Sequence, residues 1–326
     1  MNASSKNNCI AISGGVGGAK LALGLSHVLA PEQLTVVANT GDDFEHLGFR
    51  ISPDLDTVMY TLADVSNKEL GWGQVGESWN FLDSLASLGG ETWFQLGDKD
   101  LATHVVRTQL LATGKTLSEV TAYLCEQLNI RHPLLPMTDD RVATIVNTLA
   151  GEKLAFQHYF VRDRCKPEVT GFDFDGLNSA RPAPGFLSAL RDPGLAAIIV
   201  CPSNPFVSVD PVLKIPGILD EIEASKAPLI AVSPIVGGQA IKGPAAKMMK
   251  ELGMPQSALA VARYYAQRYA GKMQGFVLDE QDKVLTQEVE ALGYATIVTN
   301  TVMVTLQDRI ELARTVLEFA NEITSR

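Results

Sequence analysis

Residues 9–30 read CIAISGGVGGAKLALGLSHVLA, and this stretch decides the fold class. Its first five residues are a short apolar run typical of a buried strand, and a glycine-rich turn follows directly. After the turn, Leu21, Leu25 and Val28 recur at helical spacing, and Pro31 ends the pattern. The stretch therefore predicts a strand, a glycine turn and a helix, which is a common opening unit of a parallel α/β sheet.

Five later segments repeat the strand pattern. Each is a nearly continuous apolar run that ends in turn residues, as strands buried on both faces do. They are LTVVANT (34–40), LAAIIVCPSNP (195–205), PLIAVSPIVGG (228–238), GFVLDE (275–280) and YATIVTN (294–300). Residues 308–323 place their apolar side chains on one helical face. We therefore expect an α/β fold built on a Rossmann-like, doubly wound, mostly parallel sheet.

The middle of the chain follows a different pattern. Residues 70–135 carry helical spacing, and the runs VATIVNT (142–148) and LAFQHYFV (154–161) flank a short turn, which predicts a β-hairpin. We expect a Rossmann-like nucleotide-binding core formed by residues 1–68 and 190–326. Residues 69–189 would be a largely helical insertion with a β-hairpin, and this insertion would cover the substrate at the ligand-binding edge of the sheet.

The composition excludes several classes of function. Of the 326 residues, 27 are Lys or Arg and 37 are Asp or Glu, so the formal net charge is −10, and we expect no nucleic acid polymer as a partner. No apolar run approaches the ~20 residues of a membrane helix. The start, MNASSKNN, lacks the apolar core of a signal peptide. These features favour a cytoplasmic protein without a membrane partner, and the four scattered cysteines show no metal or disulfide spacing.

The glycine turn SGGVGGAK (13–20) is a candidate anion site. Glycines let a backbone approach an anion closely, and the next helix would direct its first amides at that anion. The segment matches neither the P-loop pattern nor GxGxxG, which disfavours an ATPase P-loop and an NAD fingerprint. The alternative is a tight turn that packs against the sheet without a ligand.

Four carboxylates follow the second strand within NTGDDFEHLGFRISPDLDTV (39–58). Asp42, Asp43, Asp54 and Asp56 would repel one another unless they are solvated, bind a divalent metal, or include a general base. Asp56 lies early in a helix expected over residues 53–64, with Ser52 as its N-cap. In the alternative interpretation, Asp54 only complements the helix dipole, and Asp42 and Asp43 only form a turn.

Four further polar segments could add groups to a site. LGDKDLATH (96–104) is a mixed-charge segment that could be a solvated loop as readily as part of a site, and His104 by itself is expected to be structural. CPSNP (201–205) and SPIVGG (233–238) follow buried strands and offer side chains that could orient a nucleotide. KGPAAK (242–247) adds two lysines near a helix start. Because no nucleophilic triad is present, positioning and electrostatics suit the site better than covalent catalysis, as in phosphoryl transfer.

Several of these motifs, taken in order, resemble one known family along nearly the whole chain. SGGVGGAKLALGL, VVANTGDD, ISPDLDTVMYTL, LGDKDLATH, PSNPFVSVDPVL and AVSPIVGG are similar to the 2-phospho-L-lactate transferases of coenzyme F-420 biosynthesis. The resemblance implies transfer of a phosphorylated three-carbon acid (2-phospholactate, phosphoenolpyruvate or phosphoglycerate) from a guanosine-diphospho donor. The acceptor would be the ribityl hydroxyl of a deazaflavin, 7,8-didemethyl-8-hydroxy-5-deazariboflavin, and GMP would be released. Magnesium (Mg²⁺) as cofactor and a homodimer are implied as well.

The resemblance also implies roles for individual residues. Asp56 and Asp43 would be catalytic, with Asp56 at the ribityl chain of the deazaflavin. Asp43 and Asp54 would bind the metal. Gln95 would contact the deazaflavin at a position where relatives can carry a basic residue, so a charge-based role is in doubt here. The donor nucleotide would be bound by Gly14, Gly15, Gly17, Gly18, Lys20, Ser203 and Asn204.

Two other functions compete with this interpretation. A related Rossmann-like group of regulatory proteins binds sugar nucleotides without turnover, but the segment SPDLDTV (52–58) favours the transferase. An NAD oxidoreductase would need GxGxxG and an acidic residue after the second strand, where Asn39 and Thr40 stand instead.

Overall fold

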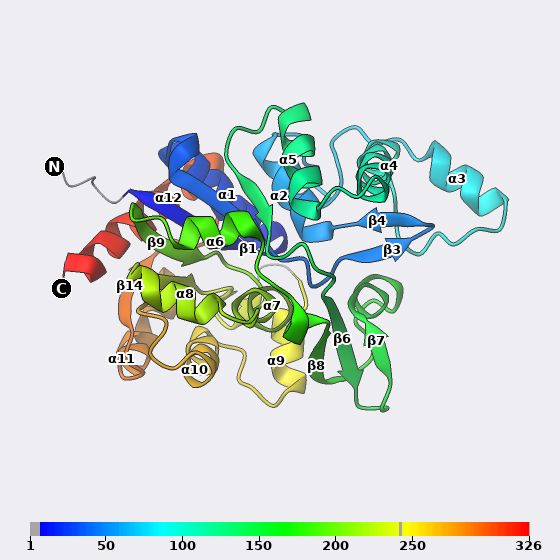
Figure 1. Ribbon diagram of the computed structural model, residues 1–326. Coiled ribbons are helices and arrows are strands. Elements are labelled where there is room, and N and C mark those ends of the chain that lie inside the picture. The colour runs from blue at the N-terminus through cyan, green and yellow to red at the C-terminus, as the bar shows by residue number, and fades with distance from the viewer. Residues whose placement is uncertain (1–6, 241–242, 326) are drawn as a thin grey trace.

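A computed structural model of the protein describes residues 7–240 and 243–325, and its centre is one parallel sheet of seven strands (Figure 1). The strand order is β14-β13-β10-β9-β1-β2-β5, and every neighbouring pair is parallel. The strands are β1 (Asn8–Ser13), β2 (Leu34–Ala38), β5 (Leu134–Pro136), β9 (Leu195–Val200), β10 (Leu229–Val232), β13 (Gly275–Asp279) and β14 (Ala295–Thr299). The six strands expected from the sequence are confirmed.

The sheet is buried on both faces because successive side chains of a strand point to opposite sides. In β1, Cys9 and Ala11 belong to one apolar cluster, whereas Ile10 and Ile12 belong to the other. The first cluster is completed by α1 (Gly15–Val28), α2 (Pro53–Leu62), α5 (Leu117–Gln127) and α12 (Leu306–Ser325). The second is completed by α6 (Pro184–Leu190), α7 (Asp210–Leu213), α8 (Ile218–Ser225), α9 (Ala245–Glu251), α10 (Ala258–Arg268) and α11 (Thr286–Glu290). Helices on both faces of a parallel sheet confirm the doubly wound, Rossmann-like fold.

A second, smaller sheet lies beside the central one and is antiparallel. It consists of β6 (Ala143–Thr148) between β7 (Lys153–Ala155) and β8 (Val169–Asp175). The predicted hairpin is confirmed, but the expectation that its second strand runs to residue 161 was wrong. After Ala155 the chain turns into a short helical segment, His158–Arg162, because Phe156 and Tyr159 are buried in the core.

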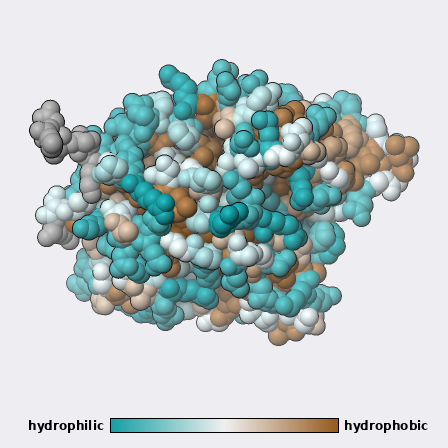
Figure 2. Space-filling view, in the orientation of Figure 1, coloured by the Kyte–Doolittle hydropathy of each residue, from teal (hydrophilic) through white to brown (hydrophobic). Residues whose placement is uncertain are grey.

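The region expected as the insertion also contributes to the central sheet, since its strand β5 pairs with β2. It carries α3 (Asn80–Ser87) and α4 (Asp98–Ala112) before α5. Helix α3 has no buried residue and lies at one end of the molecule, where Figure 2 shows hydrophobic side chains. Two hairpins complete the fold: β3 (Phe44–His46) with β4 (Phe49–Ile51), and β11 (Ile235–Val236) with β12 (Gln239–Ala240).

Within the described ranges, no helix is both long and apolar enough to cross a membrane. The first six residues of the polar start MNASSKNN lie outside the described residues.

Candidate active site

A cavity of about 650 Å³ opens where several parallel strands end at their carboxyl edge. Its wall includes Gly14 after β1, Pro202 after β9, Ser233 after β10 and Thr301 after β14. The volume lies within the range of about 300–1,000 Å³ that small-molecule sites occupy. The loops that the sequence singled out therefore meet at one site.

The glycine turn forms one wall of this cavity and is held tightly by the loop after β9. Gly14, Gly15 and Gly17 line the cavity, and α1 begins at Gly15. A Cβ atom at Gly17 would lie 2.3 Å from the carbonyl oxygen of Pro202, which explains the glycine there. Gly18 is buried outside the lining, where a Cβ atom would meet the Ser13 hydroxyl at 2.4 Å. The prediction that Gly18 contacts the donor stays a prediction, and its visible role is packing.

Lys20 lines the cavity and donates a hydrogen bond from Nζ to the carbonyl oxygen of Met303, at 2.8 Å. The second cationic segment expected near the site, KGPAAK, is described in part. Lys242 lies outside the described residues, and Lys247 pairs with Glu251 and donates to the carbonyl oxygen of Pro167.

Ser203 and Asn204 also line the cavity, but their polar atoms are already bonded. The Ser203 hydroxyl accepts from the Gly14 amide at 3.1 Å and donates to the Gly14 carbonyl oxygen at 3.0 Å. Asn204 Oδ1 accepts from the Phe206 amide at 3.0 Å, and its Nδ2 contacts the sulfur of Met248. Both side chains therefore shape the glycine turn and the loop after β9. Their predicted contacts with guanosine stay predictions.

Two carboxylates of the acidic segment, Asp42 and Asp54, face the cavity and share one amide group. Asn39 Nδ2 donates to Asp42 Oδ1 at 3.2 Å and to Asp54 Oδ2 at 2.9 Å. Burial raises the pKa of Asp54 to about 6, although its bonds with Asn39 and the Gly15 amide act in the opposite direction. Burial, followed by the charge of Asp54, raises the pKa of Asp42 well above its ordinary value. This wall of the cavity therefore carries acidic groups with little positive charge to balance them.

Asp43 is half-buried beside this wall and does not belong to the cavity lining. Its Oδ2 accepts a hydrogen bond from the Ser52 hydroxyl at 2.6 Å, and its buried Oδ1 has no hydrogen-bond partner. Burial raises the pKa of Asp43 well above its ordinary value. Ser52 is the N-cap residue of α2, as predicted, but its side chain makes no capping bond because the hydroxyl is bonded to Asp43.

Asp56 lines the cavity and is bound by an arginine that the sequence analysis missed. Arg107 on α4 donates from both terminal nitrogens, to Asp56 Oδ2 at 3.0 Å and to Asp56 Oδ1. Both side chains are buried, so this is a two-point ion pair inside the protein. The carboxylate of Asp56 is therefore fixed in place by the guanidinium group.

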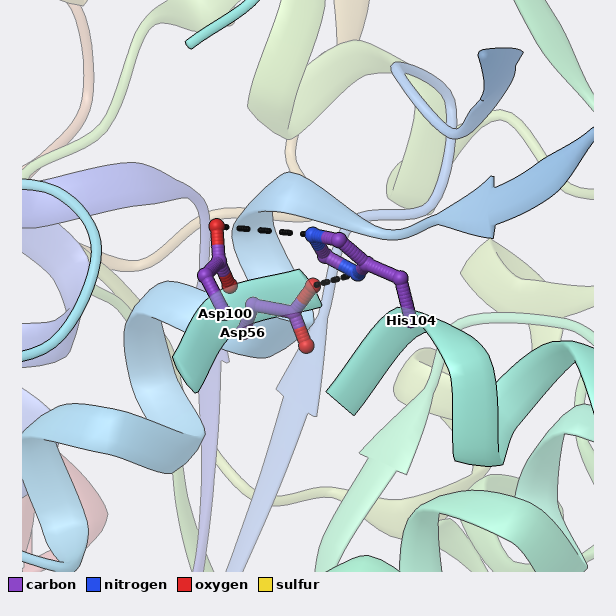
Figure 3. A group of neighbouring side chains, drawn as sticks. All are labelled: Asp56, Asp100 and His104. Atoms are coloured by element: carbon purple, nitrogen blue, oxygen red, sulfur yellow. Dashed lines mark ion pairs between the residues drawn. The ribbon is translucent and has the colours of Figure 1, made fainter. Parts of the chain in front are cut away.

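His104 and Asp100, also on α4, continue this ion-pair network into the cavity wall. Figure 3 shows Asp56, Asp100 and His104 directed toward one another. His104 Nδ1 lies 3.7 Å from Asp56 Oδ2 and its Nε2 lies 3.4 Å from Asp100 Oδ2, while the Tyr60 hydroxyl donates to Asp100 Oδ1 at 2.6 Å. Burial favours a higher pKa for Asp100, but the contacts with His104, Tyr60 and Arg107 outweigh it and lower the pKa.

In the part of the chain that the structure describes, Asp56, Asp100 and His104 are one group of three side chains with suitable spacing for a metal, their ligand atoms lying within 4.8 Å of one another. Arg107 already binds both oxygens of Asp56, so we interpret this group as an ion-pair network.

Of the two interpretations left open for residues 96–104, a solvated loop or part of a site, the structure favours the site. From Asp98 onward this segment is helix α4, and His104 lines the cavity rather than standing alone in the core. Asp100, His104 and Arg107 are spaced by four and three residues, so they share one helical face. That spacing was the signal that could have identified the network in the sequence.

Aromatic side chains form the side of the cavity that contains Gln95. Trp93 and Phe94 directly precede Gln95, and all three line the cavity together with Trp72 and Phe160. Such a wall suits a flat ring, because aromatic faces stack on one another. The contact between Gln95 and a deazaflavin stays a prediction, and the position of Gln95 is compatible with it.

The fold and the site together define a class of protein: an α/β enzyme with a glycine turn and buried carboxylates around a cavity at the carboxyl edge of its sheet. The chain belongs to the 2-phospho-L-lactate transferase CofD family, whose model matches residues 9–314. It is thus a transferase acting on phosphoenolpyruvate or phospholactate, which confirms the resemblance seen in the sequence motifs.

Similar proteins cover nearly the same length of chain. A phosphoenolpyruvate transferase of Streptomyces griseus is 41% identical over 319 residues, which cover 96% of this chain and 98% of the relative. The phosphoenolpyruvate transferase of Thermobifida fusca is 41% identical over 286 residues and covers 84% of this chain and 86% of its own. A crystal structure of a UPF0052 family protein from Bacillus halodurans has a TM-score of 0.65 at 14% identity, covering 96% of this chain and 99% of that one. This last likeness concerns the fold alone.

Proposed function

We propose that this chain transfers a phosphorylated three-carbon acid from a guanosine-diphospho donor to the ribityl hydroxyl of a deazaflavin, in coenzyme F-420 biosynthesis. The hydroxyl oxygen attacks the phosphorus nearer the acid, and the bond from that phosphorus to the bridging oxygen breaks. GMP leaves with the bridging oxygen, the hydroxyl proton is released, and the product is a phosphodiester. The names of the relatives make phosphoenolpyruvate the first acid to test.

One observation carries the proposal: the glycine turn, the buried carboxylates and the aromatic wall with Gln95 line the same cavity. The donor diphosphate would lie against Gly14, Gly15 and Gly17. The Gly14 amide donates to Ser203 and the Gly15 amide to Asp54, so the anion would be bound by the next amides at the start of α1. The deazaflavin would lie against the aromatic wall. Its ribityl chain would then reach Asp56, which lines the same cavity.

The contact with Arg107 indicates which role Asp56 has in the proposed reaction. Because both oxygens of Asp56 accept from the guanidinium group, the carboxylate is held in one orientation. An oriented carboxylate can accept the hydrogen bond of the attacking hydroxyl and direct its oxygen at the phosphorus. We therefore assign Asp56 the task of orienting the acceptor.

The acidic wall fits a magnesium ion in its chemistry. Asp43 has a buried oxygen without a partner, and the hydrogen-bond donors to Asp42 and Asp54 are neutral amide groups of Asn39, Gln157 and the Gly15 backbone, so oxygen ligands are available where positive charge is scarce. We propose that Asp43 and Asp54 hold Mg²⁺, with Asp42 beside them in the cavity wall. When bound, the ion would neutralise charge on the diphosphate.

The test is incubation of the purified protein with deazaflavin, Mg²⁺ and each of three guanosine-diphospho donors, carrying enolpyruvate, 2-lactate or glycerate. We expect GMP and a phosphodiester from at least one donor, and loss of both products when EDTA removes the metal. Absence of GMP with every donor would favour the alternative function, a non-catalytic protein that binds sugar nucleotides. The homodimer and the cytoplasmic location stay predictions.

A further inference from the structure

Arg164 is a cationic side chain that lines the cavity and that the proposed reaction has not yet used. It lies in the turn after the helical segment His158–Arg162, on the side of the cavity supplied by the middle region of the chain. Arg164 and the next residue, Cys165, both have left-handed backbone conformations, with φ of 51° and 54°. Glycine and asparagine are the usual residues in that conformation, so an arginine there calls for an explanation.

The turn is closed by its own backbone. The Cys165 amide donates to the Tyr159 carbonyl oxygen at 2.8 Å, and the Lys166 amide donates to the Asp163 carbonyl oxygen at 3.0 Å. These bonds explain why the helical segment ends in a tight turn, and Tyr159 is anchored in the core. They do not explain an arginine at the cavity, and strained backbone is often retained where it positions a functional side chain.

Arg164 differs from the other basic side chains of the cavity lining, Lys20 and His104. Lys20 donates to the Met303 carbonyl oxygen, and His104 lies between Asp56 and Asp100. Arg164 makes no hydrogen bond or ion pair with any residue of the two described ranges, and its side chain is exposed. Its neighbour Arg162 is not in the lining and is paired with Asp163 through two bonds of 2.9 and 3.0 Å.

The acidic cavity and the anionic donor together indicate what Arg164 could bind. Four lining residues are carboxylic acids, and the donor of the proposed reaction adds a diphosphate and a carboxylate. The glycine turn and a metal ion would serve the diphosphate, which leaves the carboxylate of the three-carbon acid without a positive partner. A guanidinium group matches a carboxylate with two parallel hydrogen bonds.

We propose that Arg164 binds the carboxylate of the three-carbon acid and selects donors whose transferred group is an acid. This inference rests on the proposed function and adds a specificity residue to it. Binding by calorimetry would compare wild type with Arg164→Gln and Arg164→Lys, in the presence of Mg²⁺ and without acceptor. Three ligands are compared. The first is GDP, the second is the donor that wild type turns over (the acid donor), and the third is that donor with its carboxylate converted to a primary amide (the amide donor).

Loss of a charge-assisted pair corresponds to a weakening of about 10-fold to 100-fold. We expect Arg164→Gln to weaken binding of the acid donor by that factor. Its affinities for GDP and for the amide donor should stay within about twofold of the wild-type values, so the preference for the acid donor over the amide donor should be lost. Arg164→Lys should fall between, because it keeps the charge and loses the planar fork. Arg162→Gln, on the same turn but paired outside the lining, is the matched control and should bind all three ligands as wild type does.

Equal weakening of GDP and the acid donor would overturn the inference, because the arginine would then serve the diphosphate. Unchanged affinity of Arg164→Gln for the acid donor would overturn it as well. Wild-type GMP release is measured first, so that failure of the proposed function is recognised separately. Thermal unfolding of each variant, together with retained GDP binding, shows that the variants are folded.

Discussion

Replacement of Arg107 by methionine should destabilise the protein strongly, because it would leave a carboxylate buried without its partner. The side chain of Arg107 is 2% exposed, and that of its partner Asp56 is 6% exposed. Both oxygens of Asp56 accept from the guanidinium group, so Arg107→Met would remove two charge-assisted hydrogen bonds at once. Removal of one partner of a buried ion pair costs about 3–5 kcal/mol. We therefore expect the free energy of unfolding to fall by about that amount.

The measurement is guanidinium-induced unfolding followed by circular dichroism, with wild type, Arg107→Met, Asp56→Asn and the double variant compared. In the double variant the buried charge is absent, so its loss of stability should be smaller than the sum of the two single losses by about 1–3 kcal/mol. Arg162→Met, which breaks an exposed ion pair, serves as the control and should leave unfolding nearly unchanged. A loss below about 1 kcal/mol for Arg107→Met, or strict additivity in the double variant, would refute this account of the pair.

Three more predictions concern the wall of the cavity. Burial raises the pKa of Asp54 from 3.8 to about 6, so the folded chain holds this proton more tightly than the unfolded chain. That contribution to stability is present below about pH 4 and is lost as the pH rises through about 6. In metal-free buffer, the midpoint of unfolding should therefore fall over this pH range more steeply in wild type than in Asp54→Asn. Parallel curves for the two proteins would contradict this prediction. Gly17→Ala would place Cβ 2.3 Å from the Pro202 carbonyl oxygen and should lower both thermal stability and GDP affinity, whereas Gly171→Ala, with its nearest atom at 3.9 Å, should change neither. Asp56→Asn should lower kcat far more than it weakens donor binding in a GMP-release assay, since an orienting carboxylate acts in the chemical step; equal losses would argue against that role.

The sequence predicted those parts of the protein that depend on neighbouring residues. Apolar runs and glycine turns are local patterns, and they correctly indicated six strands of the parallel sheet, a helix after the first strand and a helix that begins at Pro53. The first of these helices begins at Gly15, so it includes most of the segment expected as a glycine turn. The sheet topology then follows from general rules, because right-handed crossovers bring the carboxyl ends of parallel strands to one edge. This is why the glycine turn, Asp56 and Ser203 could be expected at one site before any coordinates were known.

Only the tertiary structure decided which partners these residues have. Asp56 pairs with Arg107, 51 positions away, because α4 packs so that this face of the helix meets the cavity. In the same way, the hydroxyl of the N-cap residue Ser52 bonds to Asp43 and not to an amide of its own helix, and Arg164 reaches the cavity from a turn of the middle region. Local periodicity identifies the buried face of a helix, but it carries no information about which distant element lies against that face. The pairing of buried charges therefore had to be read from the packed structure.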